Sequence, residues 1–268
     1  MGKVYLIGAG PGDPELLTVR AARLLGQAMV VLHDSLVSRE VLEIVPRSAK
    51  IIDVGKRCGQ KLLTQDEINA LLVSYAASHE AVIRLKGGDP LVFGRAGEEM
   101  EALRRADIAF EIVPGITAAL GAAAAAGISL TDRRAASQIV ITTYSRGSDA
   151  AVADPSAVTP QLKWAAISSS TTLVLYMPGA DYPQVSCRLR EAGQPEDLPC
   201  VIVSNATGPQ QQIRWTTVAG LAEEAKLPAP ALLIVGRVAT HKIEEIAESI
   251  RLWHSGAPDC QIRNQPIS

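Results

Sequence analysis

The chain has 268 residues, of which 47% are hydrophobic and 20% are charged, and its formal net charge is -2. This composition is typical of a globular protein and excludes collagen, coiled coil and extended disorder. With 26 basic residues against 28 acidic ones and few aromatic side chains, the chain is not expected to bind nucleic acid through bulk positive charge or base stacking.

Cysteines and hydrophobic stretches exclude several further classes. The four cysteines stand singly, without a C-x-x-C pair or a histidine at ligand spacing, so the sequence predicts neither a disulfide framework nor a metal site. The first expected strand follows Met1 without a targeting segment, and no apolar stretch is long enough to cross a bilayer. We therefore expect a soluble, cytoplasmic protein with free thiols and no membrane partner. The cysteines are Cys58, Cys187, Cys200 and Cys260.

The first half alternates short apolar runs with amphipathic stretches, which is typical of βα repeats. Its strands are rich in Val, Ile and Leu on both faces, and this predicts a parallel sheet covered by helices. Thr64 and Glu67 form a capping box at the start of one helix. The expected strands are 4–7, 29–32, 50–54, 81–85 and 110–113, and the expected helices are 15–25, 64–77 and 96–105.

A second α/β set follows a segment at 127–136 that has the composition of a linker. Its expected strands are 138–143, 172–177, 200–204, 212–216 and 231–235. Residues 145–160 are small and polar and predict a long loop, and the chain after residue 254 has no periodicity. The sequence therefore predicts two αβα domains with mainly parallel sheets, at 1–131 and 132–254, and a tail at 255–268.

A glycine-rich loop, GAGPGD at 8–13, follows the first strand directly, and Asp34 ends the next strand. This pattern is close to the dinucleotide-binding fingerprint. Its third glycine is replaced by Asp13, however, Pro14 follows, and Pro11 stiffens the loop where phosphate-binding amides are needed. The pattern therefore disfavours NAD or FAD, although three glycines exceed what a plain turn requires.

Two more loops come at expected strand ends, LKGGDPLVFGR at 85–95 and VPGITAA at 113–119. Ligands of open α/β sheets bind beyond the carboxyl ends of the strands, so these loops point to one crevice. Gly87 and Gly88 allow close approach of a ligand to the backbone, and Asp89 can accept hydrogen bonds from a ribose or an amino group. Taken alone, a GGDP turn or an alanine-rich helix could be purely structural.

Taken together, GAGPGDPELLT at 8–18, VGKR at 54–57, RLKGGDPLVFGRAGEE at 84–99 and VPGITAA at 113–119 resemble the uroporphyrinogen-III C-methyltransferases of the tetrapyrrole-methylase family. The similarity covers roughly residues 3–238. It implies the family fold, with an active-site cleft between two domains, and a homodimer. It also implies methylation of uroporphyrinogen III at C2 and C7 by S-adenosylmethionine, which leaves S-adenosylhomocysteine and gives precorrin-2 by way of precorrin-1, for sirohaem or cobalamin biosynthesis.

The resemblance also implies roles for individual residues. Asp34 matches the proposed proton acceptor, Lys56 the proposed proton donor, and Arg95 an arginine that steers the carboxylates of the substrate. Methyl transfer from a sulfonium needs alignment and removal of a proton rather than a metal, and a carboxylate at a strand end suits the second task. Without the resemblance, Asp34 could equally be a helix N-cap. The implied donor contacts are Pro11, Gly87, Gly88, Asp89, Val92, Thr117, Ala118, Met177, Ala206 and Ala231.

A substrate with many carboxylates predicts a locally basic trough, although each cation alone could also be ordinary solvated surface. The chain departs from the family pattern around the expected substrate mouth, at Leu91, Ala96, 124–133 and 142–144. Two alternatives therefore stay open, a methyltransferase acting on a later corrinoid intermediate and a non-catalytic relative that binds the donor or a tetrapyrrole. The expected trough residues are Lys56, Arg57, Lys86, Arg95, Arg133, Arg134 and Arg146.

Overall fold

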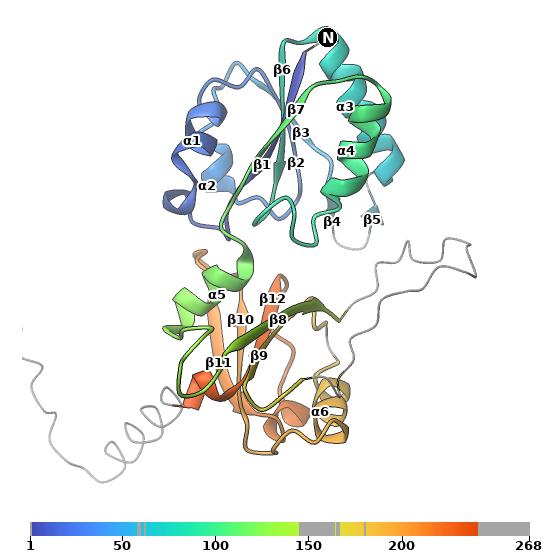
Figure 1. The fold of residues 1–268 in the computed structure, drawn as a ribbon. Coiled ribbons are helices and arrows are strands. Elements are labelled where there is room, and N and C mark those ends of the chain that lie inside the picture. Colours follow the sequence, from blue (N-terminus) through green and yellow to red (C-terminus); the bar gives the residue numbers. More distant parts are fainter. Residues whose placement is uncertain are drawn as a thin grey trace, which may run out of the picture.

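The computed structural model describes residues 2–57, 60–61, 63–144, 164, 167–179 and 181–240, with the backbone alone at 56–57 and 60–61. It contains two five-stranded sheets, and each sheet forms a unit with its own helices. The two units lie end to end (Figure 1). The expected loop at 145–160 and the expected tail at 255–268 fall outside the described residues.

The first sheet is entirely parallel and has the strand order β3-β2-β6-β1-β7. Because all five strands run in one direction, their carboxyl ends meet at a single edge of the sheet, as the sequence predicted. The strands are β1 (Lys3–Gly8), β2 (Val30–His33), β3 (Lys50–Asp53), β6 (Ala81–Lys86) and β7 (Phe110–Val113).

Helices cover both faces of this sheet (Figure 1). The helices α1 (Val19–Leu25) and α2 (Arg39–Leu42) pack on one face, and α3 (Gln65–Ser78) and α4 (Ala96–Arg105) pack on the other. The predicted capping box opens α3, where the backbone N–H of Thr64 donates to Glu67 Oε2 at 2.5 Å and that of Glu67 donates to Thr64 Oγ1 at 3.2 Å.

Three local features of the first unit differ from the prediction. The helix expected at 15–25 is two elements, a 3-10 turn η1 (Pro14–Leu16) and then α1. The division falls at Thr18, whose side chain accepts a hydrogen bond from Ala21 N at 3.2 Å and so starts a new helix. The short helix α2 and the two-stranded ribbon of β4 (Lys56–Arg57) and β5 (Gln60–Lys61) were not predicted.

The second sheet has the order β11-β10-β12-β9-β8 and is mixed, whereas we expected mainly parallel pairing. Only β8 and β9 pair in parallel, and the other three pairs are antiparallel. The seven residues 205–211 between β10 and β11 are too few for a parallel crossover, so these strands form a hairpin. The strands are β8 (Gln138–Thr143), β9 (Thr171–Tyr176), β10 (Pro199–Ser204), β11 (Gln212–Thr217) and β12 (Ala231–Val235).

Helix α5 (Ala118–Ala126) packs on one face of the second sheet, and α6 (Tyr182–Glu191) and the 3-10 turn η3 (Gly220–Glu223) pack on the other. The chain therefore passes from the first sheet to the second at residues 114–117 (Figure 1). Residues 127–136, expected to be a linker, instead join α5 to β8. The predicted domain limits at 131 and 254 stay a prediction.

Among the described residues, no helix is both long enough and apolar enough to cross a bilayer.

Candidate functional site

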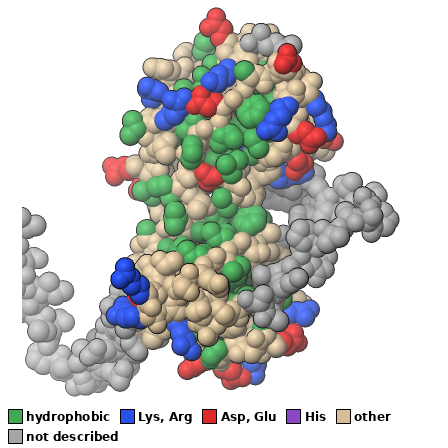
Figure 2. All heavy atoms as spheres, in the orientation of Figure 1, with side chains coloured by type: hydrophobic (Ala, Val, Ile, Leu, Met, Phe, Trp, Pro, Cys, Tyr) green, Lys and Arg blue, Asp and Glu red, His purple; other side chains and the backbone are tan. Residues whose placement is uncertain are grey.

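A cavity of about 420 Å³ lies at the junction of the two units and takes its walls from both sheets. Figure 2 shows hydrophobic side chains gathered at this waist. Three hydrophobic residues, Leu36, Phe93 and Met177, line the cavity although each is more than 40% exposed. The residues that line the cavity include Asp34 and all ten implied donor contacts, which are Pro11, Gly87, Gly88, Asp89, Val92, Thr117, Ala118, Met177, Ala206 and Ala231.

The wall from the first unit consists of the loops that follow β1, β2, β6 and β7, and the backbones of the loops after β1, β6 and β7 touch. Gly10 and Gly88 exchange two hydrogen bonds, of 3.1 and 2.8 Å, across an antiparallel bridge. A Cβ atom on Gly115 would lie 2.3 Å from the carbonyl oxygen of Gly88 and 2.8 Å from Gly8 Cα. Gly115 thus has no room for a side chain, and Gly10 and Gly88 have φ values of 73° and 68°, which favour glycine, so the loops present bare backbone to the cavity.

The carboxylate of Asp89 holds two of these loops together. Its Oδ1 accepts a hydrogen bond from Leu91 N at 2.8 Å, and its Oδ2 accepts one from Gly115 N at 3.0 Å. A single side chain thus fixes the Gly87–Gly88 turn against the loop that leads into α5.

In the wall from the second unit, Tyr176 at the end of β9 contacts the start of α5 and a ring of the first unit. Its hydroxyl lies 2.6 Å from Thr117 Oγ1 and accepts a hydrogen bond from Ala119 N at 2.9 Å. The rings of Tyr176 and Phe93, which come from different units, have centroids 5.0 Å apart. Neither Tyr176 nor Phe93 was predicted as a site residue, although Phe93 falls inside a quoted motif and Tyr176 inside the strand expected at 172–177.

A polar contact also joins the units beside the cavity. The backbone N–H of Asp13 donates to Thr207 Oγ1 at 3.2 Å, and the Asp13 carboxylate accepts from Glu15 N at 2.8 Å. Asp13, which stands where a dinucleotide fold needs its third glycine, therefore starts η1 and contacts the second unit. This use of Asp13 agrees with the prediction that the loop is not a dinucleotide fingerprint.

Of the three implied reactive residues, Asp34 is the one whose described side chain lies in the cavity wall. It follows β2, its side chain is 28% exposed, and its Oδ1 accepts a hydrogen bond from the buried guanidinium of Arg84. Arg95 precedes α4, next to the lining residue Gly94, and its guanidinium binds both oxygens of Glu98 at 2.7 and 2.8 Å. The backbone of Lys56 lies in β4, and its side chain is outside the described atoms.

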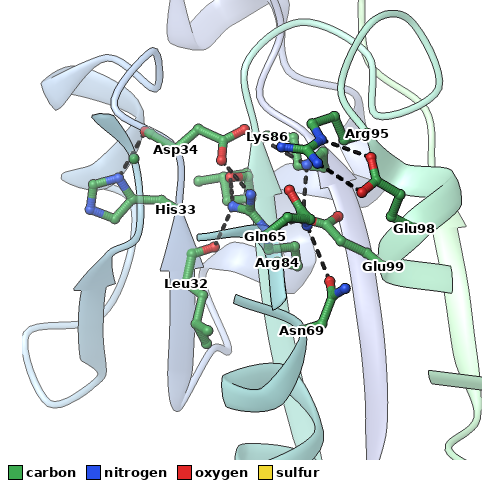
Figure 3. Close-up of polar contacts among 12 residues, drawn as sticks. Leu32, His33, Asp34, Gln65, Asn69, Arg84, Lys86, Arg95, Glu98 and Glu99 are labelled. Atoms are coloured by element: carbon green, nitrogen blue, oxygen red, sulfur yellow. Dashed lines mark hydrogen bonds and ion pairs between the residues drawn. The ribbon is translucent and has the colours of Figure 1, made fainter. Parts of the chain in front are cut away.

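The expected basic trough needs one correction. Lys86 cannot meet substrate carboxylates, because its side chain is only 3% exposed and its Nζ lies 3.0 Å from Glu99 Oε1 (Figure 3). Arg134 is exposed and paired with Asp132 at 2.8 Å. Arg146 lies outside the described residues, as do the side chains of Lys56 and Arg57.

Fold and cavity together define a two-unit α/β protein that binds a small molecule between its sheets, against glycine backbone and beside a carboxylate. The family model of the tetrapyrrole (corrin/porphyrin) methylases matches residues 3–222. The chain belongs to this family.

Individual relatives agree with this assignment. The chain is 49% identical to a uroporphyrinogen-III C-methyltransferase of Paracoccus denitrificans, over 89% of this chain and 82% of the relative. It is 46% identical to a siroheme synthase of Actinobacillus pleuropneumoniae over 89% of this chain but only 48% of that longer protein. The structure of a Thermus thermophilus uroporphyrin-III C-methyltransferase complexed with S-adenosylhomocysteine is similar, with a TM-score of 0.75 and 36% identity, covering 89% of this chain and 99% of that one.

Proposed function

We propose that the chain transfers methyl groups from S-adenosylmethionine to C2 and then C7 of uroporphyrinogen III, giving precorrin-2 by way of precorrin-1. The observation that carries this proposal is the convergence of ten implied donor contacts, from segments between Pro11 and Ala231, on one cavity that also has Asp34 in its wall. The relatives from Paracoccus and Thermus bear the name of this activity.

The cavity suits the donor by size and by chemistry. Its volume of about 420 Å³ is within the range of roughly 300 to 1,000 Å³ that is usual for small-molecule sites. Gly87 and Gly88 line the cavity without side chains, so a flat base or a ribose can lie close to the backbone there. When bound, S-adenosylmethionine supplies an electrophilic methyl group on its sulfonium.

The residues of the chain then align the two substrates, shield the reacting carbon from water and remove a proton from the tetrapyrrole. Leu36, Phe93 and Met177 border the cavity with apolar surface, which limits access of water to the reacting carbon. Once the new C–C bond has formed, the tetrapyrrole loses a proton and keeps the electron pair of the broken C–H bond, and Asp34 accepts that proton. Lys56 is proposed as a proton donor and Arg95 as a residue that steers substrate carboxylates.

An anaerobic assay tests the function directly. S-adenosylmethionine and enzymatically generated uroporphyrinogen III are incubated with the full chain, and the products are identified by mass spectrometry. We expect two added methyl groups. Methylation only when a corrinoid intermediate replaces uroporphyrinogen III in the assay would support the first alternative acceptor. Tight binding of the donor without any methylated tetrapyrrole would support a non-catalytic relative.

The role of Asp34 has its own test. Asp34→Asn keeps the shape of the side chain but removes the base, so we expect turnover to fall by about a hundredfold or more, the usual range for a lost general base. The affinity for S-adenosylhomocysteine, measured by calorimetry, should change little. Turnover at the wild-type rate in this variant would remove Asp34 from the mechanism.

The assembly and its location are proposals of the same kind. We propose a homodimer that works in the cytoplasm, as the resemblance to the family implies. Sedimentation of the purified full chain at several concentrations tests the dimer, and a monomer at every concentration would contradict it.

A further inference from the structure

Four charged side chains form a cluster behind the wall of the cavity (Figure 3). Arg84 and Lys86 come from β6, Glu99 comes from α4, and Asp34 follows β2. Glu99 Oε1 accepts hydrogen bonds from Arg84 Nε at 2.8 Å and from Lys86 Nζ at 3.0 Å. Arg84 also donates to Asp34 Oδ1, and Lys86 Nζ lies 3.9 Å from Asp34 Oδ2. Asp34 is the one member of the cluster that lines the cavity.

Burying these charges costs desolvation free energy. Glu99 is completely buried, and the side chains of Arg84 and Lys86 are 2% and 3% exposed. The Oε2 atom of Glu99 has no hydrogen-bond partner among the described residues. Buried ion pairs often contribute no more stability than apolar side chains of similar volume, whereas buried charges with unusual surroundings gather at functional sites. Stability alone therefore does not explain this arrangement.

We propose that Arg84, Lys86 and Glu99 are positioning residues that set the orientation and the proton affinity of the Asp34 carboxylate. The inference rests on the proposed role of Asp34 as proton acceptor. Arg84 holds Oδ1 by a hydrogen bond, while Lys86 faces Oδ2 from beyond hydrogen-bond distance. Oδ2 is thus the oxygen that takes the proton, and the carboxylate cannot rotate without breaking the bond to Arg84.

The charges of the cluster oppose one another in a way that can be tested. Arg84 and Lys86 are cations beside the Asp34 carboxylate, and Glu99 is an anion in contact with both of them. Burial lowers the pKa of the Lys86 ammonium, and the adjacent Arg84 guanidinium lowers it further. Removing one cation or the one buried anion should therefore shift the basicity of Asp34 in opposite directions.

Other charged groups near Asp34 stay the same in such an experiment. The Nδ1 of His33 lies 3.0 Å from the backbone oxygen of Asp34, and Asp53 on β3 is the register partner of His33. Asp89 is the other carboxylate in the cavity wall. Lys56 and Arg57 are on the nearby ribbon, with side chains outside the described atoms.

The test measures the pH dependence of kcat in two single variants of the full chain. Glu99→Gln leaves an uncompensated cation beside Asp34, so the acid limb of the profile should move to lower pH and the plateau should fall. Lys86→Met removes a cation, so the acid limb should move to higher pH. We expect each shift to be about one pH unit, which is a tenfold change in rate on the limb. The carbon-13 NMR signal of the Asp34 carboxyl is assigned by its absence in Asp34→Asn. Its titration midpoint should move in the same two directions, whichever step limits turnover.

Matched variants separate this role from a structural one. Glu101→Gln removes a carboxylate from the exposed side of α4, where Glu101 pairs with Arg105, and should leave the profile unchanged. Lys86→Arg keeps the charge and should restore a profile close to wild type. Lys86→Gln removes the charge with a polar side chain and serves if Lys86→Met does not fold.

Each remaining outcome has a distinct meaning. If Asp34→Asn is inactive while neither the limbs nor the NMR titrations move, or both move the same way, the positioning inference is wrong and the proposed function stands. If Asp34→Asn retains turnover, the proposed proton acceptor is wrong, and this inference fails with it.

Discussion

Asp89 shapes the ligand site through its hydrogen bonds to the backbone of the site loops. Both of its oxygens accept hydrogen bonds from backbone N–H groups, those of Leu91 and Gly115. The carboxylate therefore fixes the distance between two glycine loops. It still has lone pairs that can accept hydrogen bonds from a hydroxyl or amino group of the methyl donor.

Replacing Asp89 should consequently weaken donor binding more than it weakens the fold. Asp89→Ala removes the acceptor of the exposed Leu91 N–H and of the part-buried Gly115 N–H. We expect a loss of about 1–3 kcal/mol in donor binding, measured by calorimetry with S-adenosylhomocysteine. Asp89→Asn keeps one acceptor oxygen and should lose less. The exposed Asp197 provides the control, since Asp197→Ala should bind as wild type does. Unchanged affinity in Asp89→Ala would contradict the role given to this residue.

At the scale of elements, the glycine loops depend on backbone packing that no other residue allows. In Gly115→Ala the new methyl group would overlap the backbone of β1 and of the Gly88 turn. We expect this variant to lose measurable donor binding and to be destabilised by at least ~1–3 kcal/mol, the usual cost of overpacking.

A second glycine gives the matched control on the same chain. Gly97 lies inside α4, and a Cβ there would meet no atom within 4 Å. Gly97→Ala should therefore stabilise the protein by about 0.5–1 kcal/mol, because alanine is the better helix former. Urea unfolding of both variants measures the two effects, which should have opposite signs. The assignment of the loops would be wrong if Gly115→Ala behaved like Gly97→Ala.

Helix α5 has its N-terminal cap supplied by β9, a strand of the sheet on which it packs. Its N-cap residue, Thr117, makes no side-chain cap hydrogen bond, and the Ala119 N–H donates instead to the hydroxyl of Tyr176. Tyr176→Phe should therefore cost about 0.5–2 kcal/mol in unfolding free energy, as the loss of a helix cap does, and should weaken donor binding at Thr117 and Ala118.

The control for Tyr176 is Tyr144, whose hydroxyl makes an exposed hydrogen bond to Gln184. Tyr144→Phe should change the unfolding free energy by no more than about 0.5 kcal/mol. Equal effects of the two substitutions in thermal or urea unfolding would mean that Tyr176 does not act as the cap.

These elements also indicate what the sequence could and could not predict. The glycine loops were predictable because their backbone requirements are local and leave a mark in the sequence. Tyr176 was not, since its partner N–H is 57 positions away. Glu99 reads as an ordinary solvated helix residue until α4 is seen to cover β6. The direction of the strands in the second sheet was not predictable either, because buried parallel and antiparallel strands have the same apolar pattern.

At the scale of the whole molecule, the apolar cores of the two units are separate. Two hydrophobic clusters belong to the first sheet and two to the second sheet with α5. The described contacts across the junction include the Asp13–Thr207 hydrogen bond and the Phe93–Tyr176 ring contact. A ligand in the cavity touches both walls, so its binding energy should couple the unfolding of the two units.

Urea unfolding followed by two probes tests this coupling. The three tryptophans, Trp164, Trp215 and Trp253, all belong to the second half of the chain, so their fluorescence reports on that half, whereas far-UV ellipticity reports on both. Without ligand, the two transitions should not coincide. S-adenosylhomocysteine at a hundred times its Kd stabilises the bound protein by about 2.7 kcal/mol, so both transitions should move to higher urea and converge. A Trp253→Phe variant limits the signal to Trp164 and Trp215, and coincident transitions in the free protein would mean that the units unfold together without help from the ligand.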